Sequence, residues 1–474
     1  MFDDHMVMVV ITRLLLYPPL AYGRLGPSPT PCDNYSWGPN DLTPRGTGKT
    51  TIRPEETLDV AADGTVTVRT PAEVQFKDVH GFRPVCPFFE LHAEWTTDEG
   101  MQSGPLTPEV LTAAGQHLAD LRWEVTVANL KAFHYTQDGG DRIAAHAELA
   151  GNDTTRRHLD GRSPEGASNP LVPPGAGVPL GSVQVIRPSA EVPGLRLRFT
   201  PAAGAVYGPT DLPRRTNVFV LPAERLVLNP DAAWCGFGLT GDDPRTNPGG
   251  LFAGAEQNTS LGLVDDVCDG MVRVGLPGGL SAVARIVVGP PDFAPDRRPF
   301  NSAADGLTDR VRREDVHDPG YVADQTMTTL EVRDLFERIL ETVDNINIDV
   351  QNERARAENA AIARALGLPL EHARDRAFAP AEPLPGRPLP LTERGRQRHR
   401  RFVALEVIED LLREQPDLIQ RLVREPMTGE RYYDQRMPAL MRGSDRHPLH
   451  LTRRQYDLLL AWAAALRSAT EAGT

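Results

Sequence analysis

The 474-residue sequence is short of basic residues, of cysteine and of long apolar runs, and each shortage excludes a class of protein. Lys and Arg number 51 against 64 Asp and Glu, which gives a formal net charge of −13. Nucleic-acid binding requires clustered Lys and Arg, and anionic membrane surfaces attract basic segments. We therefore expect neither a nucleic acid nor a membrane among the partners of this chain.

Cysteines and long apolar runs are also scarce in this sequence. The four cysteines, Cys32, Cys86, Cys235 and Cys268, show no C-x-x-C spacing and are too few to staple a secreted scaffold of this size. The apolar run VMVVITRLLLYPPL is interrupted by Arg13. It is shorter than the ~20 residues of a membrane span and lacks a signal-peptide cleavage site. We interpret it as a buried strand and expect a cytoplasmic protein with reduced thiols.

The segment PRGTGKTTIRP matches the end of the phosphate-binding consensus G-x-x-x-x-G-K-[ST] through Gly48, Lys49 and Thr50. The full consensus also needs a glycine where Thr43 stands and a helix that begins at the lysine. The β-branched residues that follow and Pro54 favour extended chain instead. We expect a glycine loop leading into a strand, and no binding of ATP or GTP.

Proline and glycine are abundant, with 43 and 41 residues, and they favour short strands and loops. Apolar residues alternate at Val66 and Val68 and again at Trp123, Val125 and Val127, as in strands with one buried face. Further short apolar runs that stop at or near a proline are VQVIRP, LRLRFTP, NVFVLP, RLVLNP and SAVARIVVGPP. We expect an α+β protein with a β-rich N-terminal body of sandwich-like sheets over residues 1–322.

The hydrophobic period changes from 2 to 3.6 near Asp324, which predicts helices in the C-terminal part. A long amphipathic helix is expected over residues 323–368, with an apolar stripe at Leu330, Leu335, Ile339, Val343 and Ile346. A proline-rich linker over residues 369–392 and a helical C-terminal region over residues 393–474 are expected to follow.

The last helix is expected to begin at Thr452, which has capping-box spacing with Gln455. It carries two apolar flanks, one of Tyr456, Leu459, Leu460, Ala463 and Leu466 and the other of Leu458 and Trp462. Two flanks predict burial on both sides, and we expect this helix to dock a partner chain or a second copy. The alternative is that the long helix from Leu330 covers the second flank.

Five stretches, in chain order, resemble one family. They are LLLYPPLAYGRLGPSP, VQFKDVHGFRPVCPFFELHAEW, LRWEVTVANLKAFHY, LGLVDDVCDGMVRV with ARIVVGPPDFAPD, and MPALMRGSDRHPLHLTRRQYDLLLAWA. The family is that of L-lysine ε-oxidase and glycine oxidase, the cysteine tryptophylquinone amino-acid oxidases. The resemblance implies oxidative deamination of a free amino acid to hydrogen peroxide and ammonia, on a quinone built from a tryptophan joined to a cysteine.

The resemblance covers the family's N-terminal and middle parts and stops before its quinone-bearing region. The cross-linked pair of the family lies beyond the segment that residues 451–462 resemble, and this chain ends soon afterwards. No catalytic or cofactor-binding residue, and no cofactor, is therefore assigned to this chain. The polar ending SATEAGT favours a genuine terminus. Two hypotheses remain: a non-catalytic scaffold or binding member, or part of a split or truncated oxidase whose quinone half is on another chain.

Two residue groups could carry chemistry independently of the family. Trp234 and Cys235 are adjacent, with Asp231 nearby, but neighbouring strand side chains point to opposite faces. We expect a core tryptophan and a buried thiol there. A second group comprises Asp265, Asp266 and Asp269, whose oxygens could hold calcium or magnesium. Such residues more commonly bond backbone N–H groups in a turn before a strand, so no metal is expected.

The remaining polar features predict structural roles. No G-x-S-x-G serine elbow is present. His92 and His134 are expected among strand residues as hydrogen-bonded structural groups. The basic cluster RGRQRHRR, residues 394–401, is expected to form a solvated helix face.

Overall fold

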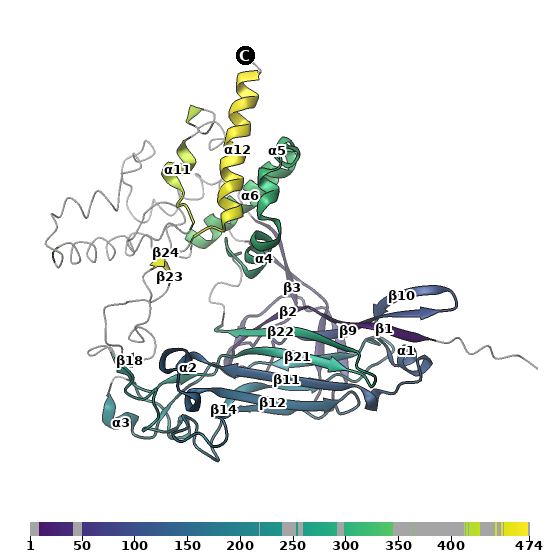
Figure 1. The fold of residues 1–474 in the computed structure, drawn as a ribbon, viewed down its shortest axis with the longest axis vertical. Coiled ribbons are helices and arrows are strands. Elements are labelled where there is room, and N and C mark those ends of the chain that lie inside the picture. The colour runs from purple at the N-terminus through teal and green to yellow at the C-terminus, as the bar shows by residue number, and fades with distance from the viewer. Residues whose placement is uncertain are drawn as a thin grey trace, which may run out of the picture. The chain divides into compact units, whose positions relative to one another are not determined.

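The computed structural model describes residues 9–40, 50–217, 219–238, 253–254, 259–291, 298–344, 364, 412, 414–415, 417–426, 441–442, 447–448 and 450–472. The fold is α+β, with the large sheets in the N-terminal part and the longer helices after them (Figure 1). The chain divides into two compact units. Unit 1 comprises Met1–Ser36 and Arg53–Phe293, and unit 2 comprises Trp37–Ile52 and Ala294–Thr474.

Two large sheets make up most of unit 1. The six-stranded sheet has the order β1-β9-β15-β14-β13, and β10 also pairs with β9. Its strands are β1 (Val10–Tyr17), β9 (Phe88–Thr97), β10 (Gly100–Pro105), β13 (Arg157–Gly161), β14 (Val178–Val185) and β15 (Arg196–Thr200). The five-stranded sheet has the order β12-β11-β21-β22-β2. Its strands are β2 (Leu20–Arg24), β11 (Arg122–Asn129), β12 (Ile143–Ala150), β21 (Asp269–Gly275) and β22 (Ser281–Gly289).

A single apolar core lies between these sheets. Trp123, Val125 and Val127 of β11 are fully buried, as their alternation predicted, and they share one cluster with Leu91 of β9 and Leu197 of β15. Side chains from both sheets therefore interdigitate as in a β-sandwich. Most strand pairs in the two sheets are antiparallel, whereas β2 and β22 run parallel.

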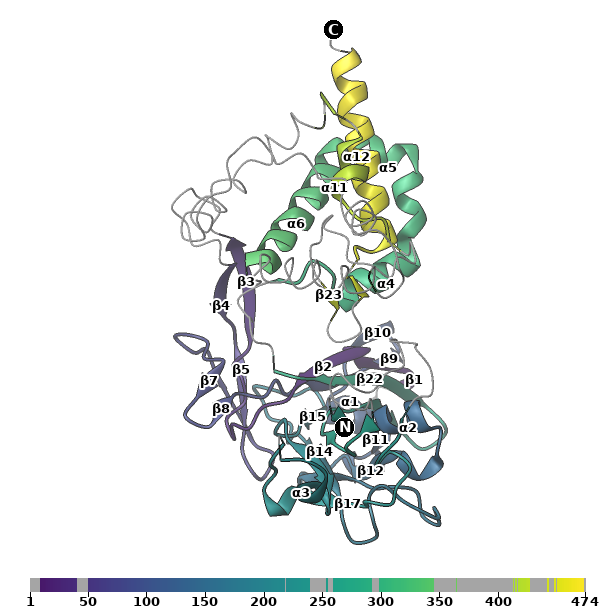
Figure 2. The ribbon, with the colours of Figure 1, turned by 90° about the vertical axis from the view of Figure 1, so that its left-hand side faces the viewer.

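Shorter elements accompany the two large sheets (Figure 2), and the paired strands over residues 35–40 and 50–54 lie largely in unit 2. The short strands are β3 (Tyr35–Asn40), β4 (Thr50–Pro54), β5 (Thr57–Val60), β6 (Val66–Arg69), β7 (Lys77–Asp78), β8 (Gly81–Phe82), β16 (Val206–Pro209), β17 (Leu226–Leu228), β18 (Ala253–Gly254), β19 (Thr259–Ser260) and β20 (Val264–Asp265). The helical turns are α1 (Pro108–Ala113), η1 (Leu118–Asp120), α2 (Lys131–Thr136), η2 (Gly139–Asp141), α3 (Leu212–Arg215) and η3 (Ala223–Arg225).

The N-terminal apolar run forms strand β1, as predicted, and only its last residue, Leu20, belongs to the next strand, β2. The backbone leaves β1 at Tyr17 and enters β2 at Leu20, and the two strands belong to different sheets. The proline pair between them cannot donate to a ladder, which accounts for the break. None of the described helices combines the length and the apolarity that crossing a membrane requires.

The phosphate-loop-like segment is only partly described. Thr50–Pro54 forms strand β4, so the prediction of extended backbone there is confirmed. Thr43, Gly46, Gly48 and Lys49 lie outside the described residues.

The prediction of a strand at NVFVLP is wrong. The described residues of this run lie in irregular backbone, and Phe219 and Val220 are 44% and 85% exposed. An apolar segment becomes a strand only where another strand supplies hydrogen bonds, and the described part of the chain places none beside it.

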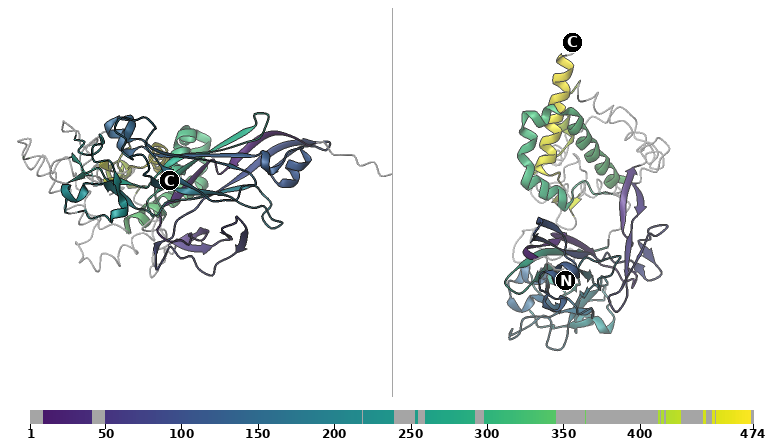
Figure 3. Two further views of the ribbon diagram at one scale, coloured as in Figure 1. Left: turned by 90° about the horizontal axis from the view of Figure 1, so that it is seen from below. Right: turned by 90° about the vertical axis from the view of Figure 1, so that its right-hand side faces the viewer.

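Unit 2 has a separate apolar core built by helices. They are α4 (Ala303–Arg312), η5 (Arg313–His317), α5 (Pro319–Ala323), α6 (Gln325–Asp344), α11 (Leu418–Leu422) and α12 (Arg453–Ala472), with the short strands β23 (Met441–Arg442) and β24 (His447–Pro448). Figures 2 and 3 show α12 running alongside α5 and α6. Leu335 and Ile339 of α6 face this core as predicted.

The buried stripe of α6 nevertheless differs from the predicted one. Val332, Leu335, Phe336 and Ile339 are buried, whereas Leu330 is 54% exposed. The described helix ends at Asp344, and the rest of the helix expected over residues 323–368 falls mainly outside the described residues, as do the linker over residues 369–392 and the basic cluster over residues 394–401.

Helices begin before residue 322, where we expected the β-rich body to end. Ser302 starts α4 through a capping box: its Oγ accepts from the N–H of Asp305 at 3.2 Å, and the Asp305 carboxylate accepts from the N–H of Ser302 at 2.7 Å. Asp318 caps α5 in a similar way, by accepting from the N–H groups of Gly320 and Tyr321. These Ser and Asp residues are helix-start signals that do not depend on the hydrophobic period.

Helix α12 begins as predicted. The Thr452 N–H donates to Gln455 Oε1 at 2.9 Å, and the Gln455 N–H donates to Thr452 Oγ1 at 3.2 Å, which completes the capping box. Gln455 Nε2 also donates to the carbonyl of Phe300, so the cap is tied to the start of unit 2's helical part.

Both apolar flanks of α12 are covered inside unit 2. Leu458, Leu459 and Trp462 are buried in the same cluster as the apolar residues of α6, and Trp462 Nε1 donates to Thr329 Oγ1 at 3.1 Å. Coverage by the long helix, which was the alternative to docking, therefore accounts for the burial of these flanks. Association through this helix stays a prediction.

Candidate anion-binding pocket

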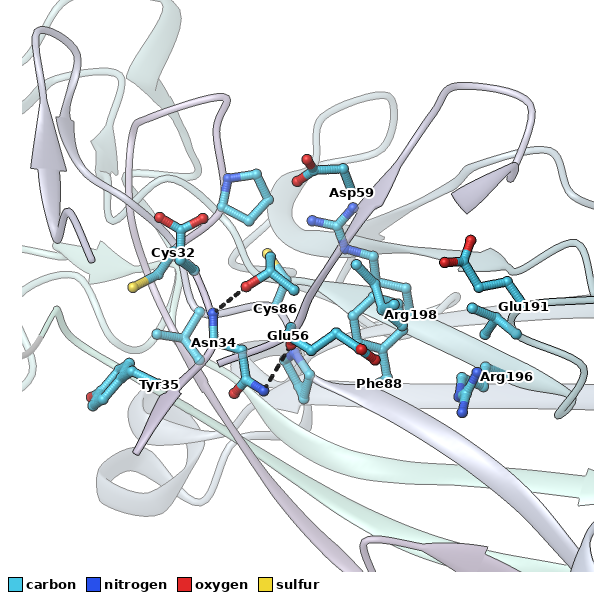
Figure 4. A pocket seen from close by; sticks show the side chains of 17 residues that line it. Cys32, Asn34, Tyr35, Glu56, Asp59, Cys86, Phe88, Glu191, Arg196 and Arg198 are labelled. Carbon is cyan, nitrogen blue, oxygen red and sulfur yellow. Dashed lines mark hydrogen bonds between the residues drawn. The ribbon is translucent and has the colours of Figure 1, made fainter. Parts of the chain in front are cut away.

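A cavity of about 450 Å³ opens in unit 1 beside strand β15. Its lining comes from five separated segments: residues 31–35, 56–59, 85–88, 191–192, and Arg196 with Arg198. Figure 4 shows the Arg198 side chain in the middle of this lining, with Cys32 and Tyr35 toward one end and Arg196 and Glu191 toward the other. The volume suits a small molecule.

Strand β15 brings two arginines to the cavity. Residues two apart in a strand point to the same side, so Arg196 and Arg198 line the cavity while Leu197 packs into the core. The strand register places Arg196 opposite Glu90 and Arg198 opposite Phe88. One arginine therefore has an acidic neighbour and the other an aromatic one.

The charge of Arg196 is neutralised within the protein. Its Nη2 forms an ion pair with Glu90 Oε2, and the other oxygen of Glu90 lies 2.7 Å from His92 Nε2. The His92 ring in turn contacts the edge of Tyr17, with ring centroids 4.9 Å apart. The expected structural, hydrogen-bonded role of His92 in a strand is confirmed.

The charge of Arg198 has no such counter-ion. The residue is only 5% exposed, and no carboxylate of the described residues lies within ion-pair distance. Its Nε is buried without a hydrogen-bond partner in the described structure, and the guanidinium carbon lies 5.8 Å from the centroid of the Phe88 ring. A buried charge without a partner is costly, so the cavity presents an arginine that a bound anion would satisfy.

The most buried acid of the lining is already paired. Asp33 accepts from Arg69 at 2.5 Å and from Arg83 at 3.4 Å, and Arg69 also holds Asp59 at 2.5 Å. These ion pairs fix the loop before β3 against the hairpin of β5 and β6. They leave neither carboxylate to neutralise Arg198.

Two further acids line the exposed part of the cavity. Glu56 and Glu191 are solvent-exposed and form no ion pair with any residue that the structure describes. The backbone near Glu56 is held in place, because Asn34 Nδ2 donates to the Glu56 carbonyl and the Asn34 N–H donates to Thr57 Oγ1. The two carboxylates add negative charge where a ligand would enter.

Two thiols line the same cavity but are protonated near neutral pH. Burial, assisted by the charge of Asp33, raises the pKa of Cys32 to about 11. Burial also raises the pKa of Cys86, and the nearby Arg198 guanidinium opposes that rise only in part. Since the thiolate is the reactive form of cysteine, these residues supply walls and not nucleophiles.

No protein-family model matches the chain, and no curated protein matches it. Solved structures that resemble it include the Schiff base intermediate of L-Lys epsilon-oxidase from Marinomonas mediterranea with L-Lys, at 17% identity and a TM-score of 0.32, covering 62% of this chain and 38% of that one. A second structure of that oxidase has 17% identity and a TM-score of 0.32, with 64% and 40% covered.

A third structure, the epsilon-lysine oxidase from Marinomonas mediterranea, is similar at 16% identity with a TM-score of 0.32, and it too is covered over 40% of its length. The chain thus spans about two fifths of the length of these structures. At this identity and TM-score, the likeness amounts to a distant structural relation.

The three aspartates considered as metal ligands differ in their interactions and in their exposure. Asp265 accepts from Lys131 Nζ at 2.6 Å and from Asn129 Nδ2 at 3.2 Å. Asp266 is buried and accepts from two backbone N–H groups, and Asp269 is exposed at the start of β21. Within the described residues no group of His, Cys, Asp and Glu is arranged to hold a metal ion.

The prediction that His134 lies in a strand is wrong, because the residue lies in helix α2. Asn129 Oδ1 accepts from the N–H of Lys131 at 3.1 Å, so the Asn129 side chain closes β11 with an Asx turn and the helix follows. The His134 ring contacts Tyr135, with centroids 5.5 Å apart, and both residues line a second cavity of about 520 Å³.

Trp234 and Cys235 each make contacts with other residues. The Trp234 ring stacks with Tyr135 and with Phe237, and its Nε1 donates to the carbonyl of Leu263 at 3.0 Å. The Cys235 sulfur instead contacts the carbonyl of Asn229, and burial raises the pKa of this thiol to about 12. This arrangement is that of a core tryptophan and a protonated thiol.

Sequence reasoning missed Arg198. The run LRLRFTP predicted only a strand bounded by a proline. Its arginines alternate with apolar residues and so share one face. That alternation is the signal that could have placed two cations together. It does not show which of them lacks a counter-ion.

Proposed function

We propose that this chain is a non-catalytic binding member of the lysine ε-oxidase-like group, whose β-rich unit 1 binds a small anion through Arg198. The family assignment rests on the sequence resemblance. The binding role rests on the buried arginine without a counter-ion in a cavity of about 450 Å³.

The side chains around Arg198 support binding rather than catalysis. Both thiols of the cavity have raised pKa values. A guanidinium stays charged at any physiological pH and is a poor general acid or base. An anion held there gains two charge-assisted hydrogen bonds without being activated.

The test is an anion-binding measurement on the full chain. Thermal unfolding is followed in chloride, sulfate, phosphate and acetate for the wild type, for Arg198→Met and for Arg196→Met. We expect at least one anion to raise the Tm of the wild type and of Arg196→Met more than that of Arg198→Met, because sulfate and phosphate also stabilise folded proteins without binding to a site. Without added anion, Arg198→Met should be as stable as the wild type or more so, because removing an unpaired buried charge removes its desolvation cost.

An unchanged anion response in Arg198→Met, or no response in the wild type, would contradict the binding role. Arg198→Lys keeps the charge without the planar fork and covers the case in which the methionine variant fails to fold. A weaker response than that of the wild type is expected for it.

The alternative proposal is that the chain is part of a split amino-acid oxidase whose quinone half is on another chain. Under the main proposal, the purified chain has the mass of its sequence, does not stain for quinone with nitroblue tetrazolium at alkaline pH, and releases no hydrogen peroxide from amino acids. Peroxide and ammonia formed only after mixing with a separate chain that bears the cysteine and tryptophan would favour the alternative.

A further inference from the structure

We propose that the ligand of the Arg198 pocket is a small monocarboxylate with an apolar body, an inference that rests on the proposed anion-binding function. Three features of the lining carry it: one arginine without a counter-ion, apolar lining residues that include the Phe88 ring beneath that arginine, and acidic side chains in the exposed part of the cavity.

The number of uncompensated cations sets the charge of the ligand. Arg198 is the one arginine of the described lining that has no carboxylate partner, since Arg196 is paired with Glu90. A single guanidinium neutralises one negative charge, and its planar fork matches the two oxygens of a carboxylate. A phosphate dianion would leave one negative charge uncompensated inside the cavity.

Some of the side chains that line the cavity are apolar, among acidic, basic and amide side chains. Leu58, Pro87, Phe88 and Val192 line the cavity, and the guanidinium lies over the Phe88 ring. An aryl or alkyl group attached to the carboxylate would cover this surface and exclude water from it. Acetate has only a methyl group beside its carboxylate and would leave this apolar surface exposed to water.

Acidic side chains disfavour ligands of higher charge. Glu56 and Glu191 line the exposed part of the cavity without ion pairs in the described structure. Their carboxylates repel a second negative charge on a ligand more than they repel a single charge already compensated by Arg198. The lining therefore selects monoanions over polyanions.

Titration calorimetry of the full chain with four probes tests the ligand class. Benzoate carries both the carboxylate and the apolar body, benzamide lacks the charge, acetate lacks the body, and inorganic phosphate carries more charge. We expect benzoate to bind tightest, with acetate about tenfold weaker or more and benzamide about 30-fold weaker or more.

Variants identify the site and the source of selectivity. Arg198→Met should weaken benzoate binding about 30-fold or more, whereas Arg196→Met should change it only a few-fold. Replacing Glu56 and Glu191 together by Gln should strengthen phosphate binding more than benzoate binding. If Arg198→Met does not fold, Arg198→Lys should still weaken benzoate binding while leaving the circular dichroism spectrum unchanged.

The outcomes separate the ligand class from the binding function. Phosphate that binds more tightly than benzoate, in a manner that Arg198→Met abolishes, overturns the monocarboxylate and leaves the anion-binding function standing. Benzamide that binds as well as benzoate overturns the role of the charge. If no probe binds, and no simple anion raises the Tm, the binding function itself fails and the ligand class fails with it.

Discussion

At the scale of single residues, Asp266 is a buried carboxyl group whose surroundings make stability depend on pH. It is 1% exposed, and one oxygen accepts from the N–H groups of Gly204 and Ala205 at 3.0 and 2.8 Å. The other oxygen finds no partner among the described residues. Burial raises the pKa of this carboxyl from 3.8 to about 6, because the two hydrogen bonds compensate desolvation only in part.

The raised pKa predicts a loss of stability with rising pH. A carboxyl whose pKa is higher in the folded state binds protons more tightly there, so its contribution is full below pH 3.8 and is lost as the pH rises through about 6. Between pH 4.5 and 7.5 the wild type should lose about 2 kcal/mol of unfolding free energy relative to Asp266→Asn. Urea unfolding of both proteins across this range measures the difference, in which the other titrating groups cancel. Parallel pH profiles would contradict the prediction.

At the scale of elements, the close approach of β21 to β11 depends on one glycine. A Cβ added at Gly270 would lie 2.0 Å from the carbonyl oxygen of Thr126 and 2.8 Å from the Cα of Val127. Both neighbours are backbone atoms of β11 in the five-stranded sheet and cannot move as a side chain would.

Gly270→Ala is therefore expected to destabilise unit 1 by about 1–3 kcal/mol. Gly104→Ala in β10 is the matched control, because its added Cβ would meet only Trp95, at an ordinary 3.8 Å. The control should stay within about 0.5 kcal/mol of the wild type. Calorimetric unfolding measures both, and equal shifts for the two variants would show that the close approach is not the cause.

Helix α12 depends on the capping box at its start. Thr452→Ala removes the oxygen that accepts from the Gln455 N–H and should cost unit 2 about 1 kcal/mol. Thr452→Ser keeps that oxygen and should stay close to the wild type. The measurement is thermal unfolding followed by circular dichroism, and a serine variant as unstable as the alanine one would mean that the methyl group matters rather than the cap.

At the scale of the whole molecule, two separate apolar cores predict two cooperative units. The cluster of the sandwich and the cluster around α6 and α12 share no residue. Differential scanning calorimetry should resolve two transitions, of which Gly270→Ala lowers one and Thr452→Ala the other. A single transition shifted equally by both variants would mean that the units unfold together.

Association with a second copy is also a property of the whole molecule, and light scattering of the pure chain measures it. The flanks of α12 that suggested docking are buried against helices of the same unit, with Trp462 at 1% exposure. Trp462→Phe should therefore remove a blue-shifted, iodide-protected component of the fluorescence whether or not the chain associates.

Much of the local structure could be predicted from the sequence alone. Alternation located β11, because a period of two is set by the pleat of a single strand. The spacing of Thr452 and Gln455 located the start of α12, because a capping box spans one turn. Both signals depend on residues a few positions apart, so no tertiary information is needed to read them. The exposed Leu330 shows the limit, since an apolar residue near the stripe is buried only if a neighbour reaches it.

Only the tertiary structure decided the pairing of strands and the character of the pocket. Strand β2 runs parallel to β22, and β9 lies between β1 and β15, although these segments are far apart in the chain. The pocket collects side chains from five segments, and the single uncompensated charge of Arg198 depends on Glu90 facing Arg196 and on Asp33 facing Arg69 and Arg83. Charge compensation is a property of distances between remote residues, and those distances exist only after the sheets have paired.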